Sequence, residues 1–300
     1  MKGRLVLSVM FALAACGSDA NKTDVVSAPE PDRMELFQDV LAQHQAINSR
    51  VERVAHRLLT VNADRCAETV RATGMSVHTL RDYPRELRPM ARHFLGVDEG
   101  ISVRSVVPDG PAWDAGVEAG DAIRRVGTMP VERSVVADRI WRIAEGRELQ
   151  EEDVALGLVR EGKRVAADVE TVEACDVEVG VAFSEELNAF TDGERVVITS
   201  ELVRRTASDS RLALILAHEL AHVIAHVGPG TERSFDRGPE AEIEADALGL
   251  ELLNRAGFDA TEAVDEMESF ARQLTQGTSG THPLHEERVA RLRAAIDALR

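Results

Sequence analysis

Residues 212–222 read LALILAHELAH and place His218, Glu219 and His222 inside an otherwise apolar run. A segment that is apolar on every face predicts a buried helix. Two histidines four residues apart lie on one helix face, about 6 Å apart along the axis, so both imidazoles can reach one zinc ion. Glu219 stands beside the first histidine, where its carboxylate can take a proton from an attacking water. The stretch therefore predicts metal-dependent hydrolysis, usually of a peptide bond; the alternative is a hydrogen-bonded pair in the core.

His226 continues the four-residue spacing and is the first candidate for a third zinc ligand. Zinc in a hydrolase takes three protein ligands and keeps a fourth position open. On a continuous helix the Cα atom of His226 lies about 12 Å along the axis from that of His218, too far for one ion to bind both. A helix that breaks and returns would need a histidine where the chain has Gly228. We therefore expect His226 to be a supporting or capping residue.

A second helix, predicted from about residue 239 to residue 255 and closed by Gly257, offers a better third ligand. Its candidates are Glu240, Glu242 and Glu244. Glu242 has Asp246 one turn further along its own face, and this carboxylate could accept the outer N–H of a ligating histidine. Gly249 follows on that face, and small residues would let the two helices approach closely. These neighbours favour Glu242, and we expect the other two glutamates to be solvated.

The segments around this pair of helices show weaker patterns. Strand-like runs occur at residues 177–183 and 195–199, and Ser208 or Ser210 could cap the histidine helix. Apolar residues at three- and four-residue steps predict helical structure over residues 34–72. Beyond the N-terminus no apolar run approaches 18 residues, so we expect no transmembrane helix.

The first 15 residues have the pattern of a targeting segment. Two basic residues precede an apolar run from Leu5 to Ala15, which is too short to span a bilayer. The run leads into Cys16 and resembles a bacterial lipobox, whose cysteine is lipidated and becomes the mature N-terminus; the alternative is a plain secretory signal cut near Ala15. We expect a lipid-anchored protein on the periplasmic side, with the outer membrane preferred because Gly17 is not the aspartate associated with inner-membrane retention.

The composition bounds the class of protein and its partners. Of the 300 residues, 44% are hydrophobic and 29% are charged, and this length suffices for two domains with a sizeable core. A formal net charge of −17 and the lack of a clustered basic segment argue against nucleic acid as a partner. With Cys16 taken by lipid, export to an oxidising compartment would let Cys66 and Cys175 form a disulfide; the alternative is two buried thiols.

Residues 101–123 carry a second pattern. A strand-like run over residues 101–107 is followed by Pro-Ala-x-x-Ala-Gly-x-x-x-Gly-Asp-x-Ile from Pro111 to Ile123. This order resembles a PDZ domain of the bacterial HtrA type, with Gly127-Thr128 where that family usually has Asn-Gly. The resemblance implies a ligand-flanking helix and two closing strands, at residues 134–144, 154–159 and 165–172.

A PDZ domain binds an extended peptide by adding it to the edge of a sheet. The resemblance therefore implies a loop whose backbone N–H groups receive a C-terminal carboxylate, formed by Phe94, Leu95, Gly96 and Val97. The alternative is a domain that serves only as a spacer or lid.

Four motifs in order carry a further resemblance: Asn188-Ala189-Phe190, the histidine motif, the segment from Glu242 to Asp246, and Thr281-His282-Pro283 with Arg288. Together they resemble the HtpX-like, CAAX-prenyl-protease-like zinc metallopeptidases, nearest to their soluble periplasmic BepA-like branch. This resemblance implies a gluzincin-type site in which His218, His222 and Glu242 hold one zinc ion and Glu219 is the general base. It also implies that the strand after the Asn-Ala-Phe motif pairs with the substrate backbone.

The oxyanion that forms during peptide hydrolysis needs a second donor besides zinc. The one tyrosine of the chain, Tyr83, precedes the PDZ-like segment and is an improbable donor. His282 and Arg288 are the candidates, and the alternative for His282 is a structural turn residue before Pro283. We place His282 among the catalytic residues and Arg288 with Asp246 around the metal ligands.

These patterns together predict an α+β protein: a mainly helical zincin-type metallopeptidase core with a small β-sheet, and an inserted PDZ β-sandwich or barrel. The expected parts are a signal peptide (1–15), a flexible tether (16–33), an N-terminal helical part of the peptidase (34–92), the PDZ domain (93–174) and the metallopeptidase core (175–300). Cys66 and Cys175 bracket the insertion, so a disulfide would clamp it at both junctions.

The expected function is zinc-dependent hydrolysis of peptide bonds in unfolded or misassembled envelope proteins. The PDZ domain would recruit polypeptides through exposed C-termini, and a lipid anchor would provide the contact with the membrane. Two alternatives are a gated or chaperone-like periplasmic peptide-binding lipoprotein with little proteolysis, and a zinc-stabilised scaffold. An intact Glu219 favours the enzyme, because a scaffold would not need this carboxylate.

Overall fold

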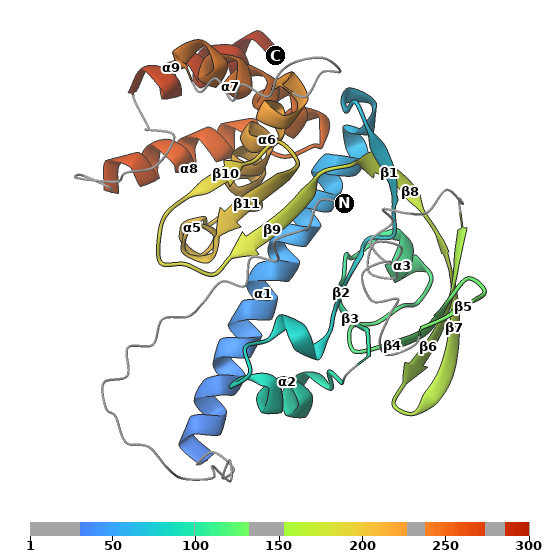
Figure 1. The fold of residues 1–300 in the computed structure, drawn as a ribbon. Coiled ribbons are helices and arrows are strands. Elements are labelled where there is room, and N and C mark those ends of the chain that lie inside the picture. Colours follow the sequence, from blue (N-terminus) through green and yellow to red (C-terminus); the bar gives the residue numbers. More distant parts are fainter. Residues whose placement is uncertain (1–30, 99, 132–152, 227–237, 274–285, 300) are drawn as a thin grey trace.

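A computed structural model describes residues 31–98, 100–131, 153–226, 238–273 and 286–299 of the chain (Figure 1). It is a mixed α/β structure organised along one long helix, α1 (Pro31–Val61). The elements that follow residue 176 lie on one side of α1, and the larger sheet lies on the other (Figure 1). Within the described ranges no helix is long and apolar enough to cross a membrane.

α1 packs through an apolar stripe, in which Val51, Val54 and Leu58 are each 1% exposed. The helix predicted over residues 34–72 is therefore correct in its first part and wrong beyond Val61. The side-chain amide of Asn62 donates to the carbonyl oxygens of Leu58 at 2.9 Å and Leu252 at 3.1 Å, which satisfies a helix-terminal carbonyl and ties the end of α1 to a later helix. The chain continues as a short 3₁₀ helix, η1 (Ala63–Arg65), and strand β1 (Thr69–Ala72).

The unit that carries the histidine motif contains three strands and five helices among the described residues. They are β9 (Glu178–Ala182), β10 (Ala189–Thr191), β11 (Arg195–Thr199), α5 (Ser200–Arg205), α6 (Asp209–His226), α7 (Pro239–Arg255), α8 (Ala260–Gln273) and α9 (Glu286–Leu299). The strands form one sheet in the order β10-β11-β9, with β11 parallel to β9 and antiparallel to β10. The strands predicted at 177–183 and 195–199 and the helix predicted over 239–255 are confirmed.

α6 runs through the main hydrophobic core of this unit. Leu212, Ala213, Ala217 and Ala221 on this helix are fully buried, as expected for a helix that is apolar on every face. Ser208 caps its N-terminus, since its hydroxyl oxygen accepts the Arg211 N–H at 3.1 Å. The core helix thus holds the histidine motif in a fixed position.

The second unit is a larger, antiparallel sheet with its own hydrophobic core. Its strands are β2 (Met75–His78), β3 (Ser102–Val106), β4 (Ala122–Val126), β6 (Asp153–Arg160) and β7 (Lys163–Glu170), in this spatial order, and β5 (Met129–Pro130) pairs with β4. Helix α3 (Pro111–Asp114) packs against β7 of this sheet, whereas helix α2 (Arg88–Leu95) packs against α1. The predicted closing strands correspond to β6 and β7, whereas the helix predicted at 134–144 lies outside the described residues. The edge strand β2 comes from before residue 93, the start that we expected for this unit.

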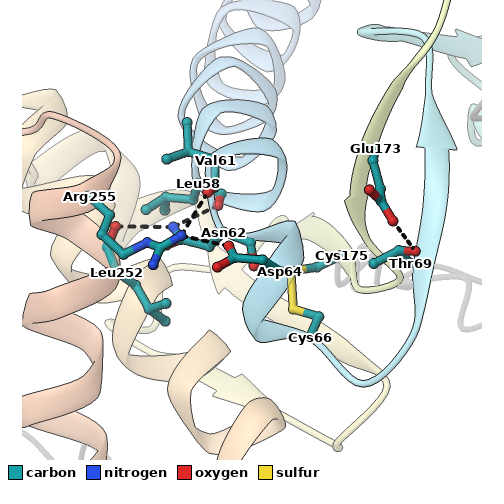
Figure 2. Close-up of a disulfide and its surroundings, with 10 residues drawn as sticks. All are labelled: Leu58, Val61, Asn62, Asp64, Cys66, Thr69, Glu173, Cys175, Leu252 and Arg255. Carbon is teal, nitrogen blue, oxygen red and sulfur yellow. Dashed lines mark hydrogen bonds and ion pairs between the residues drawn. A yellow bond between two sulfur atoms is a disulfide. The ribbon is translucent and has the colours of Figure 1, made fainter.

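A narrow neck joins the two units. β1 pairs antiparallel with β8 (Val172–Cys175), so the chain enters and leaves the larger sheet through one two-stranded ribbon (Figure 1). Beside the ribbon a disulfide joins Cys66 to Cys175, with their Cα atoms 5.5 Å apart (Figure 2). Arg255 of α7 reaches Asp64 in the same region at 2.6 Å (Figure 2). The neck is therefore fastened both across its two strands and to the helix that carries Glu242.

Candidate metal centre

α7 packs against α6 through a glycine. A Cβ atom on Gly249 would lie 3.0 Å from both the N and the Cα atoms of His218, closer than side chains normally approach a backbone. Glu242 and Asp246 precede Gly249 by seven and three residues, so all three lie on the same face of α7. The glycine thus brings this face, with its two carboxylates, against the histidine motif of α6.

The side chains of His218, His222 and Glu242 converge between these two helices. Nε2 of His218 lies 3.4 Å from one carboxylate oxygen of Glu242, and Nε2 of His222 lies 3.4 Å from the other. One ligand atom from each residue can be chosen so that all three lie within 4.8 Å of one another. Ligand atoms on a tetrahedral zinc ion are roughly 3.4 Å apart, given bonds of 2.0–2.1 Å. The three side chains therefore fit the donor set of one zinc ion.

The charge of the cluster supports the same ion. Among the described residues, Glu219, Glu242 and Asp246 contribute three carboxylates and Arg288 contributes one guanidinium, a formal charge of −2 for these four side chains when both imidazoles are neutral. His218, Glu219 and Asp246 are at most 5% exposed, so water screens these charges poorly. A divalent cation would neutralise the cluster.

Asp246 orients the first histidine of the motif. Its carboxylate lies 3.0 Å from Nδ1 of His218, on the side of the ring opposite to Glu242, and it also pairs with the guanidinium of Arg288. Burial raises the pKa of Asp246, but hydrogen bonds from His218 and Arg288 outweigh this effect and hold the pKa below its usual value. Burial lowers the pKa of His218, yet hydrogen bonds to Asp246 and Glu242 raise it overall. An ionised Asp246 favours a proton on Nδ1 of His218 and leaves Nε2 to face the other ligand atoms.

The remaining residues of the predicted centre are placed only in part. Glu240 and Glu244 are exposed on α7, as expected for solvated side chains. α6 continues unbroken to His226, which keeps the backbone of that residue two turns beyond His218. His282 and the lipidation site Cys16 lie outside the described residues. Arg288, considered as an oxyanion donor, has its guanidinium on Asp246 instead.

The segment expected to be a carboxylate-binding loop is the C-terminal end of a helix in this structure. Phe94 and Leu95 belong to the last turn of α2, and Gly96 closes that helix in the left-handed conformation. The N–H groups of Gly96 and Val97 donate to the carbonyl of Ala91, and Val97 is 1% exposed. Both N–H groups thus have partners within the chain, and the carboxylate-binding role stays a prediction.

One edge of the larger sheet is β2, a strand that was not predicted from the sequence. Met75 and Val77 alternate with Ser76 and His78 along this strand, and its two apolar side chains enter the core of the sheet. This alternation is the signal that could have identified the strand. It is a short signal, because the strand has only four residues.

Comparison with known proteins agrees with the metal centre. Peptidase family M48 matches residues 155–228 and 232–296, just under half of the chain. The beta-barrel assembly-enhancing proteases of Escherichia coli (strain K12) and Shigella flexneri are each 27% identical to this chain over 164 residues. These alignments cover 39% of this chain and 34% of each relative, so the chain spans about a third of the length of these curated relatives. The two comparisons support a metallopeptidase of family M48.

Two solved structures show a low similarity to this chain. The HtrA-type protease AlgW with a decapeptide is 23% identical, with a TM-score of 0.28 over 35% of this chain and 30% of that chain. The HtrA3 PDZ domain bound to a phage-derived ligand is 20% identical, with a TM-score of 0.28 over 36% of this chain and 90% of that chain. These scores are too low to establish a shared fold. The PDZ resemblance therefore rests on the sequence pattern from Pro111 to Ile123.

Proposed function

We propose that this protein is a zinc-dependent metalloendopeptidase. The observation that carries the proposal is the convergence of His218, His222 and Glu242 beside a buried Glu219. A scaffold or a pure binding protein would have no use for a buried carboxylate next to the ligand cluster, where its charge is costly. A hydrolase needs a base in this position.

In the proposed reaction His218, His222 and Glu242 would hold the ion, and Glu219 is the general base. Zinc, when bound, would polarise the scissile carbonyl and make an adjacent water more acidic. Glu219 takes a proton from the attacking water and later delivers it to the leaving amine. Asp246 holds the Nδ1 proton of His218, so the Nε2 lone pair stays turned toward the ligand cluster. Because the Arg288 guanidinium is engaged by Asp246, His282 is the better candidate for donating to the oxyanion.

The substrate class and the location are proposed from the relatives' names and from patterns in the sequence. The curated relatives are named as proteases that enhance β-barrel assembly, which supports envelope proteins, unfolded or misassembled, as substrates. The lipobox-like segment before Cys16 supports an anchor on the periplasmic side. The PDZ-like pattern supports recruitment of polypeptides through their C-termini. β11, the strand after the Asn188-Ala189-Phe190 motif, is already paired on both sides, with β10 and β9, so it cannot add a substrate strand. We therefore propose that substrate lies along β10, an edge strand of this sheet that contains Ala189 and Phe190 of the motif and contacts α6.

The test combines metal content with proteolysis. Wild type should contain about one zinc ion per chain and should cleave casein, and a chelator should abolish cleavage. Glu219→Gln should retain zinc and lose activity by about 10²–10⁴-fold, because it removes the base but no ligand. His282→Ala should also retain zinc but lower turnover. Cleavage that persists in Glu219→Gln would defeat the assignment of proteolysis to this site.

A further inference from the structure

Arg288 lies on α9, yet its guanidinium reaches the metal centre between α6 and α7. Its Nε donates to the two oxygens of Asp246 at 3.0 and 2.9 Å, and its Nη2 donates to Oδ1 at 2.6 Å. The same Nη2 lies 3.2 Å from Nδ1 of His218, and this Nδ1 lies 3.0 Å from Oδ1 of Asp246. A single carboxylate oxygen is therefore shared by side chains from α6 and α9.

This arrangement makes the partners of Arg288 depend on where the imidazole of His218 carries its proton. With the proton on Nδ1, His218 donates to Asp246, and its Nε2 lone pair faces Glu242. With the proton on Nε2, Nδ1 becomes an acceptor for Arg288, and Nε2 can no longer bind a cation. A bound ion selects the first form and leaves the guanidinium to Asp246 alone.

α9 also has contacts that are independent of the metal centre. Val289, Leu292 and Ile296 are 8%, 2% and 8% exposed and join the main core, and their spacing forms one stripe along the helix. Arg293 pairs with Asp265 on α8 at 2.8 Å. These contacts can keep α9 docked when no ion is bound. The hydrogen bonds of Arg288 can therefore be removed without undocking the helix.

We propose that Arg288 is a positioning residue that couples the docking of α9 to the loading of the metal centre. The proposal rests on the proposed function for its zinc ion. An ion that fixes His218 and Asp246 also fixes the carboxylate that accepts the hydrogen bonds of the Arg288 guanidinium. These hydrogen bonds hold the N-terminal end of α9. By thermodynamic linkage, the free energy by which a bound ion stabilises the docking of α9 equals the free energy by which docked α9 strengthens binding of the ion.

Hydrogen exchange measured on the full chain tests the coupling directly. Chelator-treated and zinc-loaded wild type are compared in peptides that cover α9 and, as an internal reference, α6. Zinc should slow exchange in both helices. In Arg288→Met zinc should still slow exchange in α6, but its effect on α9 should disappear. Equal responses of α9 to zinc in wild type and in Arg288→Met would overturn the proposal.

Zinc affinity, measured by competition with a chromophoric chelator, provides the reciprocal test. Arg288→Met should weaken binding by about 10–100-fold, the loss typical of an outer partner of a ligating histidine. Arg293→Met is the matched control, since it removes a guanidinium from the same helix that pairs with α8, and it should leave affinity unchanged. Arg288→Lys keeps the charge but not the planar fork, so it should restore affinity only in part. Affinities that are the same in Arg288→Met and Arg293→Met contradict the proposal.

Different results would contradict the proposed function and the coupling through Arg288. If wild type binds no zinc, the proposed function itself is wrong. If wild type binds zinc and cleaves casein while α9 is indifferent to the ion, only the coupling through Arg288 is wrong. Circular dichroism of each variant shows whether the fold survives, and the apolar stripe from Val289 to Ile296 gives reason to expect that it does.

Discussion

A cluster of charged side chains beside α1 and the metal centre differ in how their charged groups are arranged. In the first, here the junction cluster, Glu52 of α1 accepts hydrogen bonds from Ser76 and Ser105 and pairs with Arg104 at 2.5 Å. One carboxylate meets one guanidinium, so the chain neutralises itself. At the metal centre the described residues bring together three carboxylates and one guanidinium, and three potential ligand atoms converge. Burial of charge alone does not identify a site for an ion; the convergence of ligand atoms does.

The positions of the clusters fit this difference. The junction cluster fastens α1 to β2 and β3 of the larger sheet, and Glu52 and Arg104 have side chains that are 18% and 24% exposed. Its role in the structure is to join two units. The metal centre lies between α6 and α7, within the core of one unit. Three of its side chains bring ligand atoms together, and this arrangement is suited to binding an ion.

Removing one carboxylate from each cluster tests the difference between them most directly. Glu242→Gln should weaken zinc binding by more than about 100-fold, beyond the usual loss for an outer partner, and should not lower the stability of the metal-free protein. Glu52→Gln should do the reverse: it should cost about 1–3 kcal/mol of unfolding free energy, because Arg104 loses its ionised partner, and leave zinc affinity unchanged. Chelator competition and urea denaturation measure the two effects. A loss of zinc affinity in Glu52→Gln would mean that the clusters are not independent.

Acid should lower the stability of the protein through two histidines on the side of the molecule that holds the junction cluster. Burial, and then the positive charge of Arg104, lower the pKa of both His44 and His78 to about 4. The folded state favours the neutral imidazoles, so the stabilisation is complete above the unfolded value of 6.5 and is lost as the pH falls from about 6.5 toward 4. Each histidine should contribute a slope of about 1.4 kcal/mol per pH unit, or roughly 3 kcal/mol over the window.

Urea denaturation between pH 7.5 and 4.5 measures this slope. His78→Gln should flatten the pH dependence by the contribution of one histidine, whatever it does to stability at neutral pH. His93→Gln is the matched control, because His93 is exposed on α2. Identical slopes in the two variants would exclude His78 as a source of the acid sensitivity.

The disulfide at the neck should matter for stability but not for the metal. Cys66→Ala with Cys175→Ala should lower the unfolding free energy by about 2–4 kcal/mol, because the crosslink closes a loop of sequence separation 109 in the unfolded chain. Zinc affinity should stay within error of wild type, since the paired strands β1 and β8 still close the neck. A large loss of zinc affinity in this variant would show that the neck positions α7.

A cost in stability similar to that of Glu52→Gln is expected at the contact between α6 and α7. Gly249→Ala should cost about 1–3 kcal/mol, because its Cβ would meet the backbone of His218 at 3.0 Å and force the helices apart. Zinc affinity should fall with stability, since Glu242 and Asp246 move with α7. Gly180→Ala is the control, because a Cβ there meets nothing within 4 Å. Unchanged zinc binding in Gly249→Ala would mean that the centre adapts to a shift of the helix.

Much of the local structure around the centre was predictable because it depends on short-range rules. The helix over 239–255 follows from Pro239 at its start and Gly257 after its end, and the spacing of His218 and His222 places them on one face. The end of α1 at Val61 was not predictable in this way. It depends on the Asn62 side chain bonding a carbonyl of α7, a contact 190 residues away in sequence.

The chemical groups that this protein can offer are readable from its amino-acid sequence: two imidazoles and a carboxylate at helical spacing, a second acidic helix with a glycine on its face, and two cysteines that bracket an insertion. Which of these groups meet depends on how the chain packs. The tertiary structure placed Arg288 on Asp246, joined Cys66 to Cys175, and closed Phe94–Val97 into the end of a helix. The reason is physical: periodicity and capping act within a few residues, whereas the pairing of buried charges depends on packing between segments distant in the chain.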